Sequence, residues 1–212
     1  MNKQSDTRFF IIAVIAILIV GSGLLVYESQ SVQRGILKTT GDQLRDQLVV
    51  RHNMIQNSIE SSALKVRFLF STPPVSGLVR AAQNGGIDPL DSTPTERWKS
   101  RLKTIYIGFL ENNPEIYQIR YIGEADSGKE LIRVERRHSK ISAAPDALLQ
   151  SKGDQEYFQM IRKLPPGEVY VSDLNLNKEH GKLEYPYRPT YRVGMPVYDG
   201  EFQFFGLIII SV

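Results

Sequence analysis

The sequence predicts an α+β protein anchored in a membrane. Three observations lead to this expectation: an uncharged apolar run near the amino terminus, a long helical pattern after it, and a later change of hydrophobic period from about four residues to two. The expected architecture is a single transmembrane helix, a long juxtamembrane helix, and a five-stranded antiparallel sheet with its helices segregated from the strands. The ranges are 1–8 for a cytoplasmic tail, 9–27 for the membrane span, 28–72 for the long helix and 73–212 for the globular module.

Composition narrows the classes of function. The chain has 212 residues, with 26 Lys and Arg against 23 Asp and Glu, and no cysteine. A net charge of +3 gives no strongly basic surface, so a nucleic-acid partner is not expected. Without a thiol there is no disulfide, no Cys-ligated metal and no cysteine nucleophile.

The first element is the run Phe9–Tyr27, nineteen residues without a charge. At about 1.5 Å per residue, a helix of this length nearly spans the hydrocarbon core of a bilayer. A cleaved signal peptide is the alternative, because Lys3 and Arg8 resemble a basic leader and Gly21-Ser22-Gly23 resembles a cleavage site. We favour the retained anchor, since apolar residues continue past Gly23. The charges before the span mildly favour an amino terminus in the cytoplasm, which would leave the bulk of the chain outside it.

The second element is a helix that continues to Phe70 and is stopped by Pro73-Pro74. An apolar stripe with a period near 3.5 runs along it. Its members are Leu44, Leu48, Ile55, Ile59 and Val66. Two interpretations stay open: the stripe packs on the chain's own domain, or it pairs with a second copy to form a homodimer.

The globular part begins with the capping box Thr93-Pro94-Thr95-Glu96, which predicts a helix that ends at Asn112-Asn113-Pro114. Its expected core face is Trp98, Leu102, Ile105 and Phe109. A later helix is expected over 155–163, and strands over 116–122, 130–137, 168–173, 190–198 and 202–212. The last strand is apolar on both faces and is expected to be central. Because a natural chain rarely ends on such a strand, we expect a longer protein that continues past Val212.

Four segments carry a resemblance to a known family. They are the runs 166–181 (PGEVYVSDLNLNKEHG) and 188–198 (RPTYRVGMPVY), with 128–134 and 149–158 in support. Together they resemble the double-Cache sensor domains of bacterial membrane receptors, most of all those of histidine kinases and diguanylate cyclases. Over residues 28–212 the resemblance implies a periplasmic, PAS-like, membrane-distal module with a solute pocket, followed by a second module. The Arg-x-Trp-Tyr cluster of its amino-acid-binding members is absent, which argues against an amino-acid ligand.

Candidate ligand-binding residues are the polar side chains that strand alternation, a turn or the family placement aims inward. They are Arg120, Tyr121, Arg133, Lys152, Asp154, Tyr157, Tyr170, Asp173 and Arg192, with Glu135, Ser172 and Arg188 beside them. Arginine binds carboxylates through two N–H groups, aspartate holds an ammonium group, and tyrosine supplies a wall with a polar tip, so we expect a small polar or anionic solute. The alternatives are cross-strand ion pairs of Arg120, Arg133 and Glu135 on an exposed face, and a helix N-cap for Asp154.

Catalytic signatures are missing. The three histidines His52, His138 and His180 lie far apart without a nucleophile elbow, P-loop or zinc motif, so no enzyme, metal or cofactor is expected in this chain. The sequence predicts an extracytoplasmic sensory domain of an inner-membrane receptor, whose output is a histidine kinase, then a diguanylate cyclase, then a chemoreceptor in order of preference. The alternative is a membrane-anchored periplasmic docking module without a small-molecule ligand. A third, an anchored hydrolase, has no motif in its favour.

Overall fold

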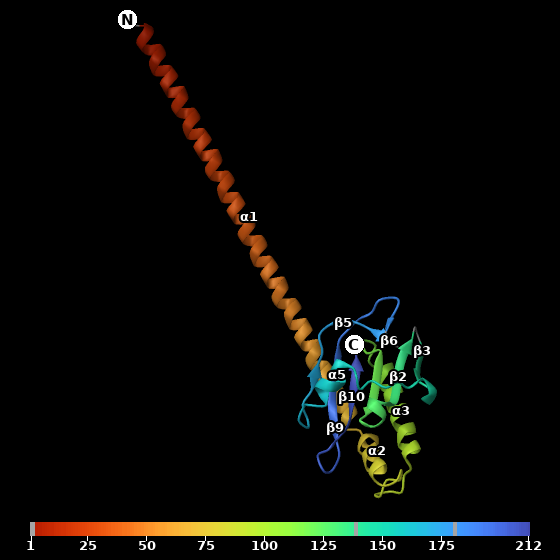
Figure 1. The fold of residues 1–212 in the computed structure, drawn as a ribbon. Helices are drawn as coiled ribbons and strands as arrows, with labels where there is room; N and C mark the ends of the chain where they lie inside the picture. The colour runs from red at the N-terminus through yellow and green to blue at the C-terminus, as the bar shows by residue number, and fades with distance from the viewer. Residues whose placement is uncertain (1–2, 138–139, 180–181) are drawn as a thin grey trace. The chain divides into compact units, whose positions relative to one another are not determined.

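A computed structural model describes residues 3–137, 140–179 and 182–212. The chain divides into two compact units, residues 1–56 and residues 57–212. All strands of the described residues lie in the second unit (Figure 1). The second unit therefore contains the sheet.

The long helix α1 spans Lys3–Phe70, and its end at Phe70 is as predicted. It ends just before Pro73-Pro74, and the two prolines begin α2 (Pro73–Gln83), where a missing N–H costs nothing. Among the described residues, no helix combines the length and the apolar character that crossing a membrane requires. Most side chains of the predicted span, 9–27, lie outside the described part of the structure.

The apolar stripe of α1 behaves differently along its length. Val66 and, nearby, Leu69 are fully buried in the core of the second unit. By contrast, Leu44, Leu48 and Ile55 are more than half exposed, at 56%, 68% and 61%. Packing on the chain's own domain is therefore confirmed at the carboxyl end of the stripe, and pairing with a second copy stays a prediction for the rest.

The main sheet of the described residues is antiparallel, with six strands in the order β3-β2-β1-β10-β9-β4. The strands are β1 (Gln118–Gly123), β2 (Glu130–Arg137), β3 (Lys140–Ala143), β4 (Tyr170–Val171), β9 (Arg192–Tyr198) and β10 (Phe204–Ser211). The prediction of five strands was wrong, because it omitted β3. This strand is only four residues long, and its apolar alternation consists of Ile141 and Ala143 alone. The predicted central position of the last strand is confirmed, because β10 lies between β1 and β9.

One face of this sheet is covered by α2, α3 (Thr95–Glu111) and the end of α1. The fully buried face of α3 is Trp98, Leu102, Tyr106 and Leu110, spaced by four residues. The predicted members Ile105 and Phe109 are only partly buried at its margin. The predicted capping box does not form: Pro94 is the N-cap, and Thr95 Oγ1 instead donates to the carbonyl oxygen of Gly86 at 3.0 Å.

The opposite face has a thinner cover of short helices and loops. The helices are α4 (Ala125–Gly128) and α5 (Glu156–Ile161). The 3₁₀ turn Asp146–Leu148 lies near α3, because Lys103 of α3 pairs with Asp146 at 3.4 Å. Two small ribbons join α4 and α5 in this cover, β5 (Asn175–Leu176) with β8 (Pro189–Thr190), and β6 (Lys178–Glu179) with β7 (Lys182–Leu183). A smaller apolar cluster packs α5 on this face, formed by Ile122, Tyr157, Phe158, Ile161, Leu207 and Ile209. Because this cluster covers only part of the face, it leaves space beside it.

Candidate functional site

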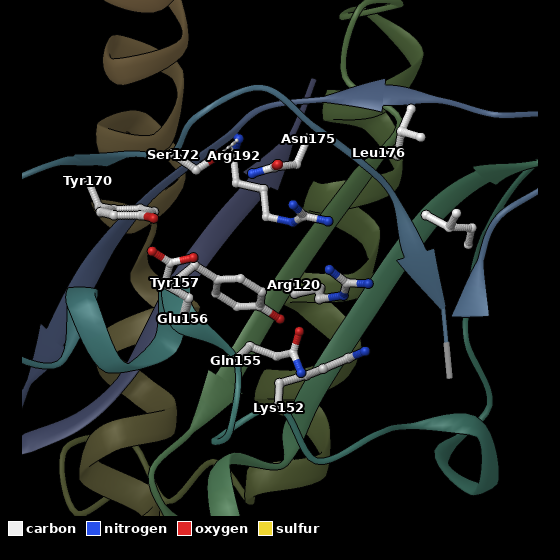
Figure 2. A pocket seen from close by; sticks show the side chains of 11 residues that line it. Arg120, Lys152, Gln155, Glu156, Tyr157, Tyr170, Ser172, Asn175, Leu176 and Arg192 are labelled. Carbon is white, nitrogen blue, oxygen red and sulfur yellow. Dashed lines mark hydrogen bonds between the residues drawn. The ribbon is translucent and has the colours of Figure 1, made fainter. Parts of the chain in front are cut away.

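A cavity of about 470 Å³ lies on the thinly covered face of the sheet (Figure 2). Strands β1, β4 and β9, helix α5 with the residues before it, and the ribbon strands β5 and β7 all contribute to its walls. Its lining residues are Arg120, Lys152, Gln155, Glu156, Tyr157, Tyr170, Ser172, Asn175, Leu176, Leu183 and Arg192. This volume lies in the lower part of the roughly 300–1,000 Å³ range of small-molecule pockets.

Arg120 reaches the cavity because of strand alternation. In β1, Ile119 and Tyr121 enter the core under the helices, whereas Arg120 and Ile122 face α5. Arg120 is 2% exposed, and its Nε lies 2.8 Å from Glu130 Oε1 on the neighbouring strand. Arg133 donates to the other oxygen of Glu130 at 3.1 Å. The predicted ion pairing is therefore present, but it is buried and centred on Glu130.

Lys152 is placed by a close backbone approach between two turns. Gly128 has a left-handed backbone (φ 72°), and a Cβ there would come within 2.6 Å of the Cα of Gly153, so only glycine is tolerated. The N–H of Lys152 donates to the carbonyl of Gly128 at 2.8 Å, and Gly153 donates to Ser127 at 3.0 Å. The Lys152 side chain is 7% exposed, and its ammonium donates to Gln150 Oε1 at 2.8 Å.

Arg192 is held by both its backbone and its side chain. Its N–H donates to Ser172 Oγ at 2.8 Å, and Nη2 donates to Asn177 Oδ1 at 2.7 Å. The guanidinium carbon lies 5.5 Å from the ring centroid of Tyr157, within range of a cation–π contact. Figure 2 shows Arg192 reaching over Tyr157 into the cavity. Its Nε is buried and has no hydrogen-bond partner among the described residues.

The charge around the cavity is mainly positive. Arg120, Lys152 and Arg192 line it, whereas Glu156, the one carboxylate among the described lining residues, is exposed. Burial raises the pKa of Tyr170, with Glu156 and Asp173 adding to the effect, so the phenol stays protonated near neutral pH. Three cations and neutral hydrogen-bonding groups favour an anionic ligand, because guanidinium groups bind carboxylates with two parallel hydrogen bonds.

The cavity brings together five of the nine candidate residues from the sequence. These are Arg120, Lys152, Tyr157, Tyr170 and Arg192. Ser172, which was considered beside them, also lines it. Glu135 and Arg188 do not: Glu135 accepts a hydrogen bond from Gln118, and Arg188 stacks on Tyr117 at 4.4 Å.

The other four candidates lie outside the cavity lining. Tyr121 is on the opposite face of the sheet, where complete burial raises its pKa and its ring packs near Phe205. Arg133 sits behind Glu130. Asp154 and Asp173 are exposed. The alternative role of Asp154 as a helix N-cap was wrong, because Gln155 occupies the N-cap and Asp154 accepts a hydrogen bond from the Gln155 side chain.

Sequence reasoning missed five lining residues. They are Gln155, Glu156, Asn175, Leu176 and Leu183. The last three belong to the ribbon strands β5 and β7, which are two residues long and carry no apolar period. Among the described residues, no cluster of His, Asp and Glu could hold a metal ion. His138 and His180 lie outside the described residues.

Comparison with known proteins gives a family and a fold. The family model described as bacterial histidine kinase, sensor domain matches residues 84–212. One similar solved structure is the domain of a protein assigned to the sensory box/GGDEF family from Vibrio parahaemolyticus (22% identity, TM-score 0.59, covering 76% of this chain and 54% of that one). Another is the extracellular domain of a protein assigned as the histidine kinase vpHK1S-Z8 (22% identity, TM-score 0.60, 76% and 52% covered).

A third solved structure is Methyl-accepting Chemotaxis protein X, with 12% identity, a TM-score of 0.51, and 76% and 57% of the two chains covered. At these identities the likeness shows the fold alone. The chain spans about half the length of these solved proteins. No curated protein sequence matches it significantly.

Proposed function

Because the chain belongs to the family of bacterial histidine kinase sensor domains, we propose that residues 57–212 bind a small anionic solute for a membrane-bound signalling receptor. The observation that carries the proposal is the 470 Å³ cavity lined by Arg120, Lys152 and Arg192. A carboxylate would bind the guanidinium of Arg192, and Tyr157 and Tyr170 would form the walls around the rest of the molecule.

The absence of a buried carboxylate in the described lining sets the ligand class. Glu156 is exposed, and Glu130, which lies behind Arg120, is already held by two arginines. An ammonium group in the cavity would meet cations without a buried counter-charge, which is costly. We therefore expect an organic acid without an amino group, in agreement with the missing amino-acid-binding motif.

A route from the cavity to α1 supports a signalling role. Tyr191 is the neighbour of Arg192 in the chain, and its hydroxyl lies 3.0 Å from Ser58 Oγ and 3.1 Å from Ser62 Oγ, both on α1. A ligand that shifts Arg192 would therefore shift a residue bonded to α1. The proposed transmission is a small displacement of α1 that accompanies binding.

The rest of the receptor follows from the sequence prediction. We propose that residues 9–27 anchor the chain in the bacterial inner membrane with the amino terminus in the cytoplasm, and that the sensor lies in the periplasm. A second module would follow the first, and the output would be a histidine kinase, with a diguanylate cyclase next and a chemoreceptor third. The exposed stripe residues Leu44, Leu48 and Ile55 would pair with a second copy.

Thermal unfolding with a panel of organic acids tests the binding proposal. At a hundred times its dissociation constant, a ligand should stabilise the folded protein by about 2.7 kcal/mol. We would pair succinate with aspartate, which differs by an ammonium group, and with succinamide, which lacks the charge. Stabilisation by succinate but by neither analogue is expected. The absence of stabilisation by any acid in the panel would contradict the proposal.

The docking alternative has one observation in its favour. Leu174, Tyr185 and Tyr187 are exposed at 68%, 85% and 63% around the ribbons, and such apolar side chains are common at interfaces. If docking is the function, replacing Tyr185 and Tyr187 by Ser should abolish receptor output. Under the same function, reversing the charges of Lys152 and Asp154 should leave output intact. The solute-binding proposal requires Lys152. It therefore expects that reversing the charge of Lys152 abolishes receptor output.

A further inference from the structure

Asn177 is a buried amide where the cavity residue Arg192 meets the two chain segments 174–177 and 183–190. It lies between β5 and β6, and only 1% of its surface is exposed. Buried amides are normally fully hydrogen-bonded, because an unmade bond in the interior is expensive. The partners of Asn177 therefore show what holds this region together.

Four hydrogen bonds converge on this residue. Its side-chain oxygen Oδ1 accepts from Arg192 Nη2 at 2.7 Å, and its Nδ2 donates to Glu184 Oε2 at 2.8 Å. Its backbone N–H donates to the carbonyl of Arg188 at 2.9 Å, and its carbonyl accepts from the N–H of Glu184 at 3.0 Å. One residue thus joins the cavity arginine to both chain segments beside the cavity, 174–177 and 183–190.

The chemistry of the junction specifically requires an amide. A carboxamide offers an acceptor to the guanidinium and a donor to the carboxylate of Glu184 from the same carbon. An aspartate would face Glu184 with a second negative charge, and an apolar residue would satisfy neither partner. A neutral acceptor also holds the guanidinium of Arg192 without cancelling its charge, which a carboxylate at the same place would do.

We infer that Asn177 is a positioning residue that fixes Arg192 for the anion and couples it to the two segments 174–177 and 183–190. Its anion-binding part rests on the proposed function. The coupling is reciprocal: an anion that holds Arg192 in place strengthens the order of the two segments, and ordered segments hold Arg192 in the binding geometry. Ser172 Oγ accepts a hydrogen bond from the backbone N–H of Arg192 and so holds only its main chain. The guanidinium of Arg192 is held by Asn177.

A ligand-free experiment tests the coupling. Amide hydrogen exchange of the full chain would be followed at Glu184, whose N–H is bonded to the Asn177 carbonyl. Both Asn177→Ala and Arg192→Ala should speed exchange at Glu184 by about tenfold or more, because each removes a bond of the junction. Asn175→Ala is the control: Asn175 lines the same cavity on the same segment, but its side chain is exposed. Unchanged exchange at Glu184 in Arg192→Ala would overturn the coupling.

An affinity experiment tests the positioning role. With succinate as the probe and calorimetry as the readout, Asn177→Ala should weaken binding about tenfold, the size expected for one hydrogen bond to a charged group. In an Arg192→Ala background the same change should have less than about a twofold effect, since Asn177 acts through Arg192. Equal losses in both backgrounds would overturn the role. If wild-type protein binds no acid, the proposed function fails, while the exchange experiment still decides the coupling.

Discussion

The two faces of the six-stranded sheet are built from the same strands but differ in what covers them. Under the helices, Leu102, Tyr106 and Ile119 belong to one large apolar core with hardly any exposed surface. On the other face, a small apolar cluster around α5 adjoins a cavity lined by Arg120, Lys152 and Arg192. Burial of apolar side chains under the helices favours folding, whereas burial of charged side chains on the opposite face is costly unless they are paired.

Strand β1 shows how one segment serves both faces. All six of its residues are buried, yet Tyr121 packs in the apolar core and Arg120 faces the cavity. The difference teaches that burial alone does not separate core from site. What separates them is whether the buried group is apolar or must be matched by a specific charge, as Arg120 is by Glu130.

The largest expected effect is on the helix-covered face. Leu102→Ala should lower the free energy of unfolding by about 2–5 kcal/mol, because it leaves a void in a fully buried core. Urea denaturation measures the effect. Leu90→Ala, at a position 75% exposed, is the control and should change stability by less than about 0.5 kcal/mol. Similar losses of stability in the two variants would show that Leu102 does not belong to a tightly packed core.

The next effect concerns the buried charges of the cavity face. Arg120→Ala should cost about 3 kcal/mol, since it removes one partner of a buried ion pair. Arg137→Ala is the matched control, because Arg137 pairs with Glu135 on the surface, where its side chain is 65% exposed. That pair should contribute less than about 1 kcal/mol. Equal losses in urea denaturation would mean that the Glu130 pair is not effectively buried.

Arg192→Ala should separate binding from stability. We expect affinity for an organic acid to fall about tenfold to a hundredfold, with a loss of stability of about 1–2 kcal/mol, because the change leaves the buried Asn177 Oδ1 without its partner. Calorimetry and thermal unfolding measure the two quantities. Arg188→Ala removes an arginine that stacks on Tyr117 outside this cavity and should leave affinity unchanged. An equal loss of affinity in both variants would contradict the site.

The last effect is the response of the helix-covered face to acid. Arg80 donates to both carboxylate oxygens of Asp88, at 2.9 Å and 2.7 Å. These bonds lower the pKa of Asp88 from 3.8 to about 2. Because the folded pKa is the lower one, the stabilisation is present above pH 3.8 and is lost as the pH falls through about 2. Asp88→Asn should remove this part of the acid dependence.

Thermal unfolding between about pH 5 and pH 2 measures this dependence. The wild-type protein should lose more stability over that range than Asp88→Asn. Parallel curves for the two proteins would show that Asp88 does not titrate differently in the folded and unfolded chains.

Local patterns in the sequence determined the elements whose causes are themselves local. The prolines after Phe70 ended α1, and strand β2 spans the predicted residues Glu130–Arg137. The apolar run at the end of the chain predicted a central strand, because only such a strand is covered on both faces. Alternation along β1 sends the neighbours Arg120 and Tyr121 to opposite faces, yet both were among the candidate residues from the sequence, and only Arg120 reaches the cavity.

Only the tertiary structure decided how the site is assembled. The pairing of Arg120 with Glu130, the approach of Gly128 to Gly153 and the junction at Asn177 each join residues that are distant in sequence or carry no local signal. The position of α5 decided that the face of Arg120, and not that of Tyr121, would hold the cavity. Period and propensity act over a few neighbouring residues, whereas a binding site depends on packing between segments that meet only in the folded chain.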